Sequence, residues 1–152
     1  MTSVNVFRFL SVLFVAVSMA GGFAHLLELP NKIDLPGDAY LTVQQIYRGW
    51  ALLGIAVVGA LISTITLAVL LRGRGAEFYL AATAAACVAA SLAVFFAFTF
   101  PANQQTMNWT VLPENWQSLR RTWEYSHAVG AMLYFIALVA LTLSLLANRA
   151  DN

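Results

Sequence analysis

Four stretches of the chain contain no Asp, Glu, Lys or Arg, and each is long enough to cross a bilayer as a helix. A spanning helix needs about 20 mainly apolar residues. The stretches are Phe9–Leu27, Trp50–Leu71, Phe78–Phe100 (which Pro101 is expected to close) and His127–Asn148. They lack the apolar–polar alternation of a membrane β-barrel. The pattern predicts an all-α, integral membrane four-helix bundle of up-down-up-down order in a single domain, residues 1–152. We place the spans at about residues 7–29, 47–71, 78–100 and 123–147.

Composition supports this class and excludes others. The chain is 61% hydrophobic and 10% charged, whereas soluble domains are about 25% charged. Eight Lys and Arg residues against seven Asp and Glu give a net charge of +1. Such a balance provides no excess of positive charge for binding phosphates, so a nucleic-acid partner is excluded. The expected partner is the lipid bilayer.

The connections between the spans predict the faces of the bundle. Only residues 72–77 join the second and third spans, whereas residues 30–46 and 101–119 form two long loops, which four spans place on one face. Each face carries four cations: Arg8, Arg72, Arg74 and Arg149 with the termini, and Lys32, Arg48, Arg120 and Arg121 with the long loops. The positive-inside rule therefore does not decide the orientation. Five of the seven acidic residues lie on the long-loop face, and together with the compact Arg-Gly-Arg-Gly turn they favour a bacterial inner membrane with both termini cytoplasmic.

Both histidines are paired with a glutamate three residues away at the edge of a span. His25 and Glu28 end the first span, and Glu124 and His127 begin the fourth. This spacing puts each pair on one helical face. Because the two helices run in opposite directions, the histidines are expected at one depth. Ionisable groups at membrane depth are costly and mark functional sites.

Three interpretations of this His/Glu cluster stay open. His25, Glu28, Glu124 and His127 could bind one transition-metal ion, because imidazole and carboxylate are suitable ligands. A full di-iron site is disfavoured, because the second and third spans contain no acidic residue. Alternatively, a histidine held by a glutamate could act as an acid–base catalyst, with His127, His25 and Glu124 as the catalytic residues. The third interpretation is that the pairs only cap helix ends or form surface ion pairs.

Aromatic and small residues add two further predictions. All four tryptophans fall on the long-loop face: Trp50, Trp109, Trp116 and Trp123. They form either an aromatic belt at the membrane interface or a pocket for a flat, apolar ligand. Small residues in the second and third spans allow close helix contacts, either within the bundle or in a homo-oligomer.

The motifs resemble a known family. They are LELPN at residues 27–31, PAN at 101–103, NW at 115–116 and LRRTWEYSH at 119–127. With four spans in a chain of this length, they resemble the anthrone-oxygenase-like family of small membrane proteins, whose bacterial members are mostly of unknown function. Fungal members are implicated in oxidising anthrones to anthraquinones without an added cofactor.

The resemblance implies a function for particular residues. His127 or His25 would remove a proton from an activated C–H group, and the carbanion would react with dioxygen. Asn103 and Trp123 would hold the substrate, and Trp109 and Trp50 are further expected binding residues. The enzyme would need no cofactor or one transition-metal ion. The alternatives are a non-enzymatic accessory subunit of a membrane complex and a metal- or quinone-binding module.

Overall fold

The computed structural model describes residues 2–150, with side chains through Ala147, and its described part is helical throughout apart from short connections. Four helical segments are long and apolar enough to cross a membrane: Ser3–Lys32, Trp50–Leu70, Ala76–Gln105 and Trp116–Ala147. The prediction of an all-α bundle with four apolar helices is therefore confirmed. The α-helices are α1 (Ser3–Lys32), α2 (Gly37–Gln44), α3 (Leu53–Leu70), α4 (Ala76–Val94), α5 (Phe100–Gln105) and α6 (Trp116–Ala150).

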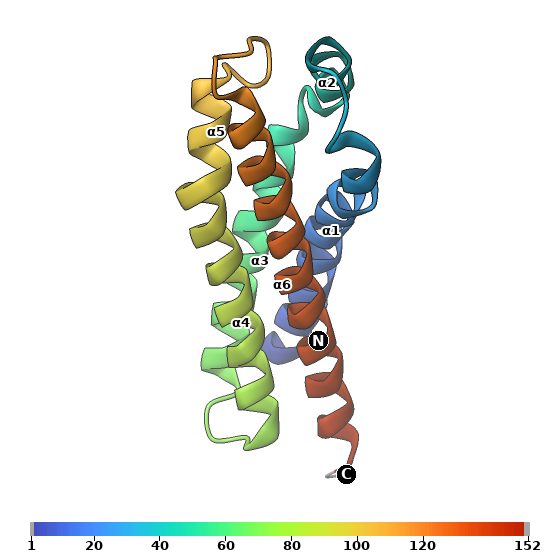
Figure 1. Ribbon diagram of the computed structural model, residues 1–152. Coiled ribbons are helices and arrows are strands. Elements are labelled where there is room, and N and C mark those ends of the chain that lie inside the picture. The colour runs from blue at the N-terminus through green and yellow to red at the C-terminus, as the bar shows by residue number, and fades with distance from the viewer. Residues whose placement is uncertain (1, 151–152) are drawn as a thin grey trace.

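The two long connections lie together at one end of the bundle, and the α3–α4 turn lies at the other (Figure 1). We call the first of these the loop end, and it comprises residues 33–52 and 106–115. Hydrogen bonds join its two segments to each other and to α6. The Gln45 amide donates to the carbonyl of Trp109 at 3.0 Å, and the Arg120 guanidinium donates to the carbonyl of Leu35 at 2.7 Å. The predicted placement of both long loops on one face is confirmed.

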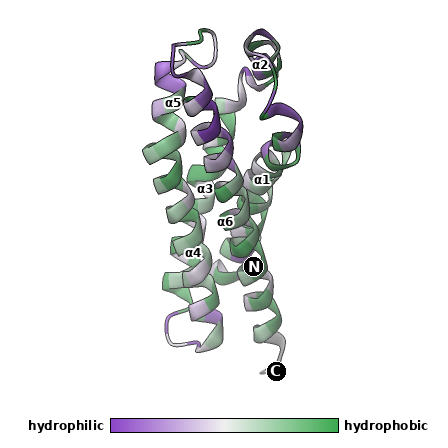
Figure 2. Cartoon of the chain, viewed as in Figure 1, coloured by the Kyte–Doolittle hydropathy of each residue, from purple (hydrophilic) through white to green (hydrophobic). Residues whose placement is uncertain are grey.

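Hydropathy follows the same axis. Hydrophobic residues cover the helices along most of their length, and hydrophilic ones gather at the loop end and at the α3–α4 turn (Figure 2). Large apolar side chains such as Ile55, Ile62 and Phe135 are exposed on the outside of the bundle, as expected where lipid is the solvent. The chain is therefore built as a multi-pass membrane protein. The inner-membrane location and the cytoplasmic termini stay predictions. Arg149 was counted among the cations of the terminus face, and its side chain lies outside the described residues.

Two helices continue past the prolines that follow the first and third predicted spans, Pro30 and Pro101. α1 continues through Pro30 to Lys32, and the third span continues past Pro101 to Gln105, so the prediction that Pro101 closes it is wrong. A π-helical turn, Phe95–Thr99, precedes α5, and Pro101 stands in the first turn of α5. Proline is tolerated there, because the wider turn and the early position remove the need for its missing N–H group. Residues 30–46, predicted as a loop, contain α2.

Small residues allow the helices to pack closely. Ala60, Ala81, Ala84, Ala131 and Ala137 are fully buried. A methyl group added at Gly22 would lie 3.1 Å from the backbone of Ala131, so α1 and α6 approach each other closely there. These small residues serve packing within the bundle.

A buried ion pair joins α1 and α4 away from the loop end. The guanidinium of Arg8 donates to the carboxylate of Glu77, and both side chains are less than a tenth exposed. Ser144 of α6 donates to the carbonyl of Glu77 at 3.1 Å. The ion pair and this hydrogen bond together connect α1, α4 and α6.

We expect Glu77→Leu to destabilise the protein by about 3–5 kcal/mol, because it leaves the buried guanidinium of Arg8 without a countercharge. The free energy of unfolding of detergent-solubilised protein, measured by titration with sodium dodecyl sulfate, tests this. The double variant Arg8→Leu/Glu77→Leu is the control and should recover most of the loss. A single variant as stable as the wild type would contradict the prediction.

Candidate functional site

The structure brings the two histidines into direct contact. His25 of α1 and His127 of α6 stack with ring centroids 4.1 Å apart and an angle of 27° between the ring planes. The expectation that they lie at one depth is therefore confirmed, and the two rings are also in contact. His25 is 6% exposed and His127 is partly buried, so His25 belongs to the interior of the protein and His127 adjoins it.

Aromatic rings enclose the imidazole pair on the side of the loop end. The ring of His25 lies 4.3 Å from Tyr47, 4.9 Å from Trp123 and 5.4 Å from Trp50, measured between centroids. Trp123 also lies 5.9 Å from Trp109. Three predicted substrate-binding tryptophans therefore surround or adjoin the histidines. This arrangement is a pocket wall rather than a belt facing lipid.

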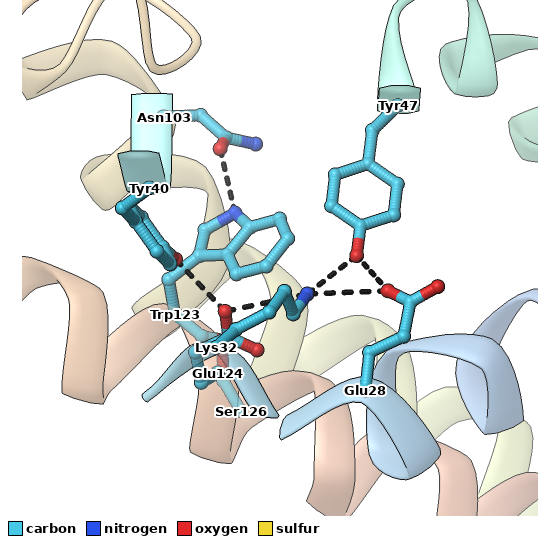
Figure 3. Close-up of polar contacts among 8 residues, drawn as sticks. All are labelled: Glu28, Lys32, Tyr40, Tyr47, Asn103, Trp123, Glu124 and Ser126. Atoms are coloured by element: carbon cyan, nitrogen blue, oxygen red, sulfur yellow. Dashed lines mark hydrogen bonds and ion pairs between the residues drawn. The ribbon is translucent and has the colours of Figure 1, made fainter. Parts of the chain in front are cut away.

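The two glutamates do not bind the histidines but gather around Lys32 (Figure 3). The ammonium group of Lys32 lies 3.4 Å from Glu28 and 3.3 Å from Glu124. Lys32 also donates to the hydroxyl of Tyr47, which in turn donates to Glu28. The hydroxyl of Tyr40 donates to Glu124 at 2.9 Å. We call these five residues the Lys32 network.

The Lys32 network changes the interpretation of the glutamates. Its ammonium group holds the position between the carboxylates that a metal ion would need. Within residues 2–150, no group of three or more His, Cys, Asp or Glu side chains is placed to bind a metal. The four predicted ligands therefore do not fit a metal ion. The described hydrogen bond and ion pair of Glu124 go to Tyr40 and Lys32 and not to His127.

The two tyrosines of the network are held in their protonated form. Burial raises the pKa of the Tyr40 hydroxyl well above its usual value, and the charge of Glu124 raises it further. Burial and the hydrogen bond to Glu28 likewise raise the pKa of Tyr47. Both phenols therefore remain donors to the carboxylates at neutral pH. Each charge of the network therefore has a partner of opposite charge, as buried charges require, although the second carboxylate oxygen of Glu124 has no hydrogen-bond partner among the described residues.

Two cavities meet at His25. The first, which we call the membrane cavity, has a volume of about 400 Å³ and extends between the helices. The second, the loop cavity, has a volume of about 530 Å³ and extends into the loop end. His25, Trp50, Ala51 and Phe95 line both, and His127 lines the membrane cavity.

All four predicted substrate-binding residues line the loop cavity: Trp50, Asn103, Trp109 and Trp123. The indole nitrogen of Trp123 donates to the side-chain oxygen of Asn103 at 2.7 Å, so Asn103 fixes the orientation of that indole. The predicted substrate-binding set is thus collected in one place.

An unusual backbone turn forms part of the loop cavity. Met107, Asn108 and Trp109 have consecutive positive φ angles of 48°, 55° and 61°. Only asparagine of these three adopts the left-handed region readily, so the turn stores strain. The backbone N–H of Trp109 donates to the hydroxyl of Thr106 at 3.1 Å, and its side chain is 2% exposed. The strained turn therefore holds a buried indole against the cavity.

The residues that the sequence did not single out are Lys32, Tyr40 and Tyr47. One signal was available for Lys32, which stands four residues after Glu28 on the same helix and so faces it. No signal marked the tyrosines: Tyr40 lies in a segment that was predicted to be a loop, and Tyr47 stands at the predicted start of the second span.

No protein-family model, no curated protein and no solved structure is similar enough to the chain to count as a match.

Proposed function

We propose that this membrane protein binds a flat, lipophilic aromatic molecule beside His25 and His127 and oxidises it with dioxygen. The observation that carries the proposal is the stacked imidazole pair, in which His25 lines both cavities and His127 lines the membrane cavity. Atom Nδ1 of His25 is buried and has no hydrogen-bond partner among the described residues. A buried polar atom of this kind costs about 1–3 kcal/mol, which a bound ligand would offset.

The chemistry follows from what a neutral imidazole can do. One of its nitrogens accepts a proton while the other donates. In the proposed reaction His127 or His25 removes a proton from a CH₂ group activated by adjoining phenolic rings. The carbanion then forms a C–O bond with dioxygen, and the imidazolium returns the proton to the peroxide oxygen, which gives a hydroperoxide on that carbon. Loss of water, made up of the O–H group of the hydroperoxide and the second hydrogen of the carbon, leaves a carbonyl group. One CH₂ group and one dioxygen molecule give one C=O group and one water molecule.

The surroundings of the imidazole pair suit such a substrate. The indoles of Trp50 and Trp123 offer flat, apolar faces beside His25, and apolar pockets with a few polar groups are typical of small-molecule sites. A carbanion is less readily quenched where bulk water is excluded. The Lys32 network would hold α1 and α6, and so the two imidazoles, in place.

Oxygen uptake with 1,8-dihydroxyanthrone tests the proposal. The protein is reconstituted in nanodiscs, and anthraquinone formation is followed by absorbance. We expect a rate well above that of empty nanodiscs. A rate equal to that of empty nanodiscs would contradict the proposed function.

Trp50→Leu tests whether the cavities are the binding site. We expect binding of 1,8-dihydroxyanthraquinone, the product, to weaken by about tenfold, or about 1.4 kcal/mol, because an aromatic contact beside His25 is lost. Quenching of the remaining tryptophan fluorescence measures the affinity. Trp116→Leu is the matched control, because Trp116 packs on Tyr40 and Arg120 and lines neither cavity. Equal weakening in both variants would count against the site.

A further inference from the structure

The membrane cavity opens sideways, towards lipid. Three residues of its lining, Ala51, Gly54 and Val58, have a spacing of three and four residues and so share one side of the helical segment that includes α3. All three are exposed, Val58 to 54%. Phe96 of the π-helical turn also lines the cavity and is 60% exposed. These four residues form a rim on the outer surface of the bundle.

The opposite side of the membrane cavity is closed. Ser91, Thr99, Ser126 and Tyr134 line it and are all less than a tenth exposed. Ser18, 5% exposed, also lines it, and its hydroxyl has no partner among the described residues. The cavity therefore has an inner side of buried residues and an outer side, at α3 and the π-helical turn, of exposed ones.

The π-helical turn shapes this opening. Such turns are rare and occur often at functional sites. Phe95 lines both cavities, whereas Phe96, the next residue, stands at the rim. On the α3 side, a Cβ atom built on Gly54 would meet nothing within 4 Å, so open space lies beside that glycine. The opening is thus continuous with the junction of the cavities.

The loop cavity has a different chemical character. Gln44 and Trp109 line it, and the side-chain nitrogen of each is buried without a hydrogen-bond partner among the described residues. Of the described residues that line this cavity, Arg48 carries a positive charge, and none is Asp or Glu. Unpartnered N–H donors call for acceptor oxygens. The loop cavity therefore favours a group that carries carbonyl or hydroxyl oxygens.

We propose that the ligand is a membrane-dissolved amphiphile with an oxygen-bearing ring and an apolar chain. The ring lies at the junction of the two cavities against His25, with its oxygen atoms in the loop cavity. The chain runs through the membrane cavity and leaves into the bilayer between Gly54 and Phe96. This inference rests on the proposed function for the position of the ring, and it adds the class of molecule and the route by which it reaches the site.

The competing occupant of the membrane cavity is an acyl chain of the bilayer itself. Moving a chain from lipid into an apolar cavity gains little hydrophobic free energy, because both surroundings are apolar. The test therefore asks whether the cavity accommodates the ligand's chain, rather than how strongly the chain binds.

The experiment compares 1,8-dihydroxyanthraquinone with the same ring carrying a decyl chain. Affinities for protein in nanodiscs are measured by tryptophan quenching and expressed as mole fraction of ligand in the bilayer, which removes the effect of partitioning. In the wild type we expect the two affinities to agree within about threefold. Gly54→Leu, which fills the rim, should weaken binding of the decyl compound by about tenfold and leave the ring compound unchanged. Ala86→Leu, which adds the same side chain at an exposed alanine of α4 outside both cavities, should change neither.

The outcomes separate the two proposals. If neither compound quenches the wild type, the proposed function fails and the inference fails with it. If the ring compound binds but the decyl compound does not, or if Gly54→Leu affects both equally or neither, only the inference is overturned. A decyl chain ending in a diazirine gives a second measurement: photolabelling of residues 51–58 and 95–99 is expected. Labelling of lipid-facing residues elsewhere would mean that a bilayer acyl chain holds the cavity.

Discussion

Lys32→Met is expected to destabilise the protein by about 3–5 kcal/mol, because breaking a buried ion pair leaves an uncompensated charge. Lys32 is 3% exposed and Glu124 is 1% exposed. Without the ammonium group, Glu124 keeps the hydroxyl of Tyr40 as its hydrogen-bond donor. The carboxylate of Glu28, which is more exposed, would also lose its ion pair. Unfolding of the detergent-solubilised protein with sodium dodecyl sulfate measures the change.

Two further variants separate charge from packing. Lys32→Met/Glu124→Gln removes both members of the buried pair and should recover most of the stability. Glu28→Gln should cost much less than Lys32→Met, because its side chain is 36% exposed and reaches solvent. If Lys32→Met were as stable as the wild type, the network would not stabilise the contact between α1 and α6.

His127→Asn is expected to lower the rate of anthrone oxidation by about 10²–10⁴-fold, the usual contribution of a general base. Asparagine retains hydrogen-bonding capacity but does not accept a proton at neutral pH. The affinity for 1,8-dihydroxyanthraquinone should change little, since the tryptophans around His25 remain. Initial rates of oxygen uptake, with the affinity measured separately, show whether the loss is in the chemical step.

His25→Asn identifies which imidazole is the base. If His127→Asn retains its rate while His25→Asn loses it, the base is His25 and the proposed chemistry stands. If both lose comparable activity, the stacked imidazoles act as a unit, since groups acting together are not additive. Full activity in both variants would contradict base catalysis by either histidine.

The sequence was sufficient for the features that depend on periodicity along one helix. Uncharged runs of membrane-spanning length gave the four apolar helices, and their number placed both long loops at one end. The opposite order of His-x-x-Glu and Glu-x-x-His, on helices that run in opposite directions, anticipated the common depth of His25 and His127 but not their contact. These inferences need only the rise per residue of an α-helix and the direction in which each helix runs through the bundle.

Features that depend on contacts between segments could not be predicted in this way. Glu28 and Glu124 were expected to accompany the histidines, but Lys32 competes for both carboxylates, and a cation satisfies them better than an imidazole does. The roles of Tyr40 and Tyr47 depend on how residues 33–52 fold over α6. Likewise, Pro101 is compatible with a continued helix because the preceding turn is π-helical and the proline stands in the first turn of α5.

The two buried ion pairs of α1 fix its position along and about its own axis. Arg8 is bonded to α4 and Lys32 to α6, and the two residues are about 36 Å apart along a helix. A shift of one residue would turn the helix by about 100° and break both pairs. The stretch of α1 between them, which includes His25, is thus a fixed wall. On the proposed route, we therefore expect the widening that admits a ligand to come from α3 and the π-helical turn, so that substitutions in Phe95–Thr99 should change the rate of ligand entry.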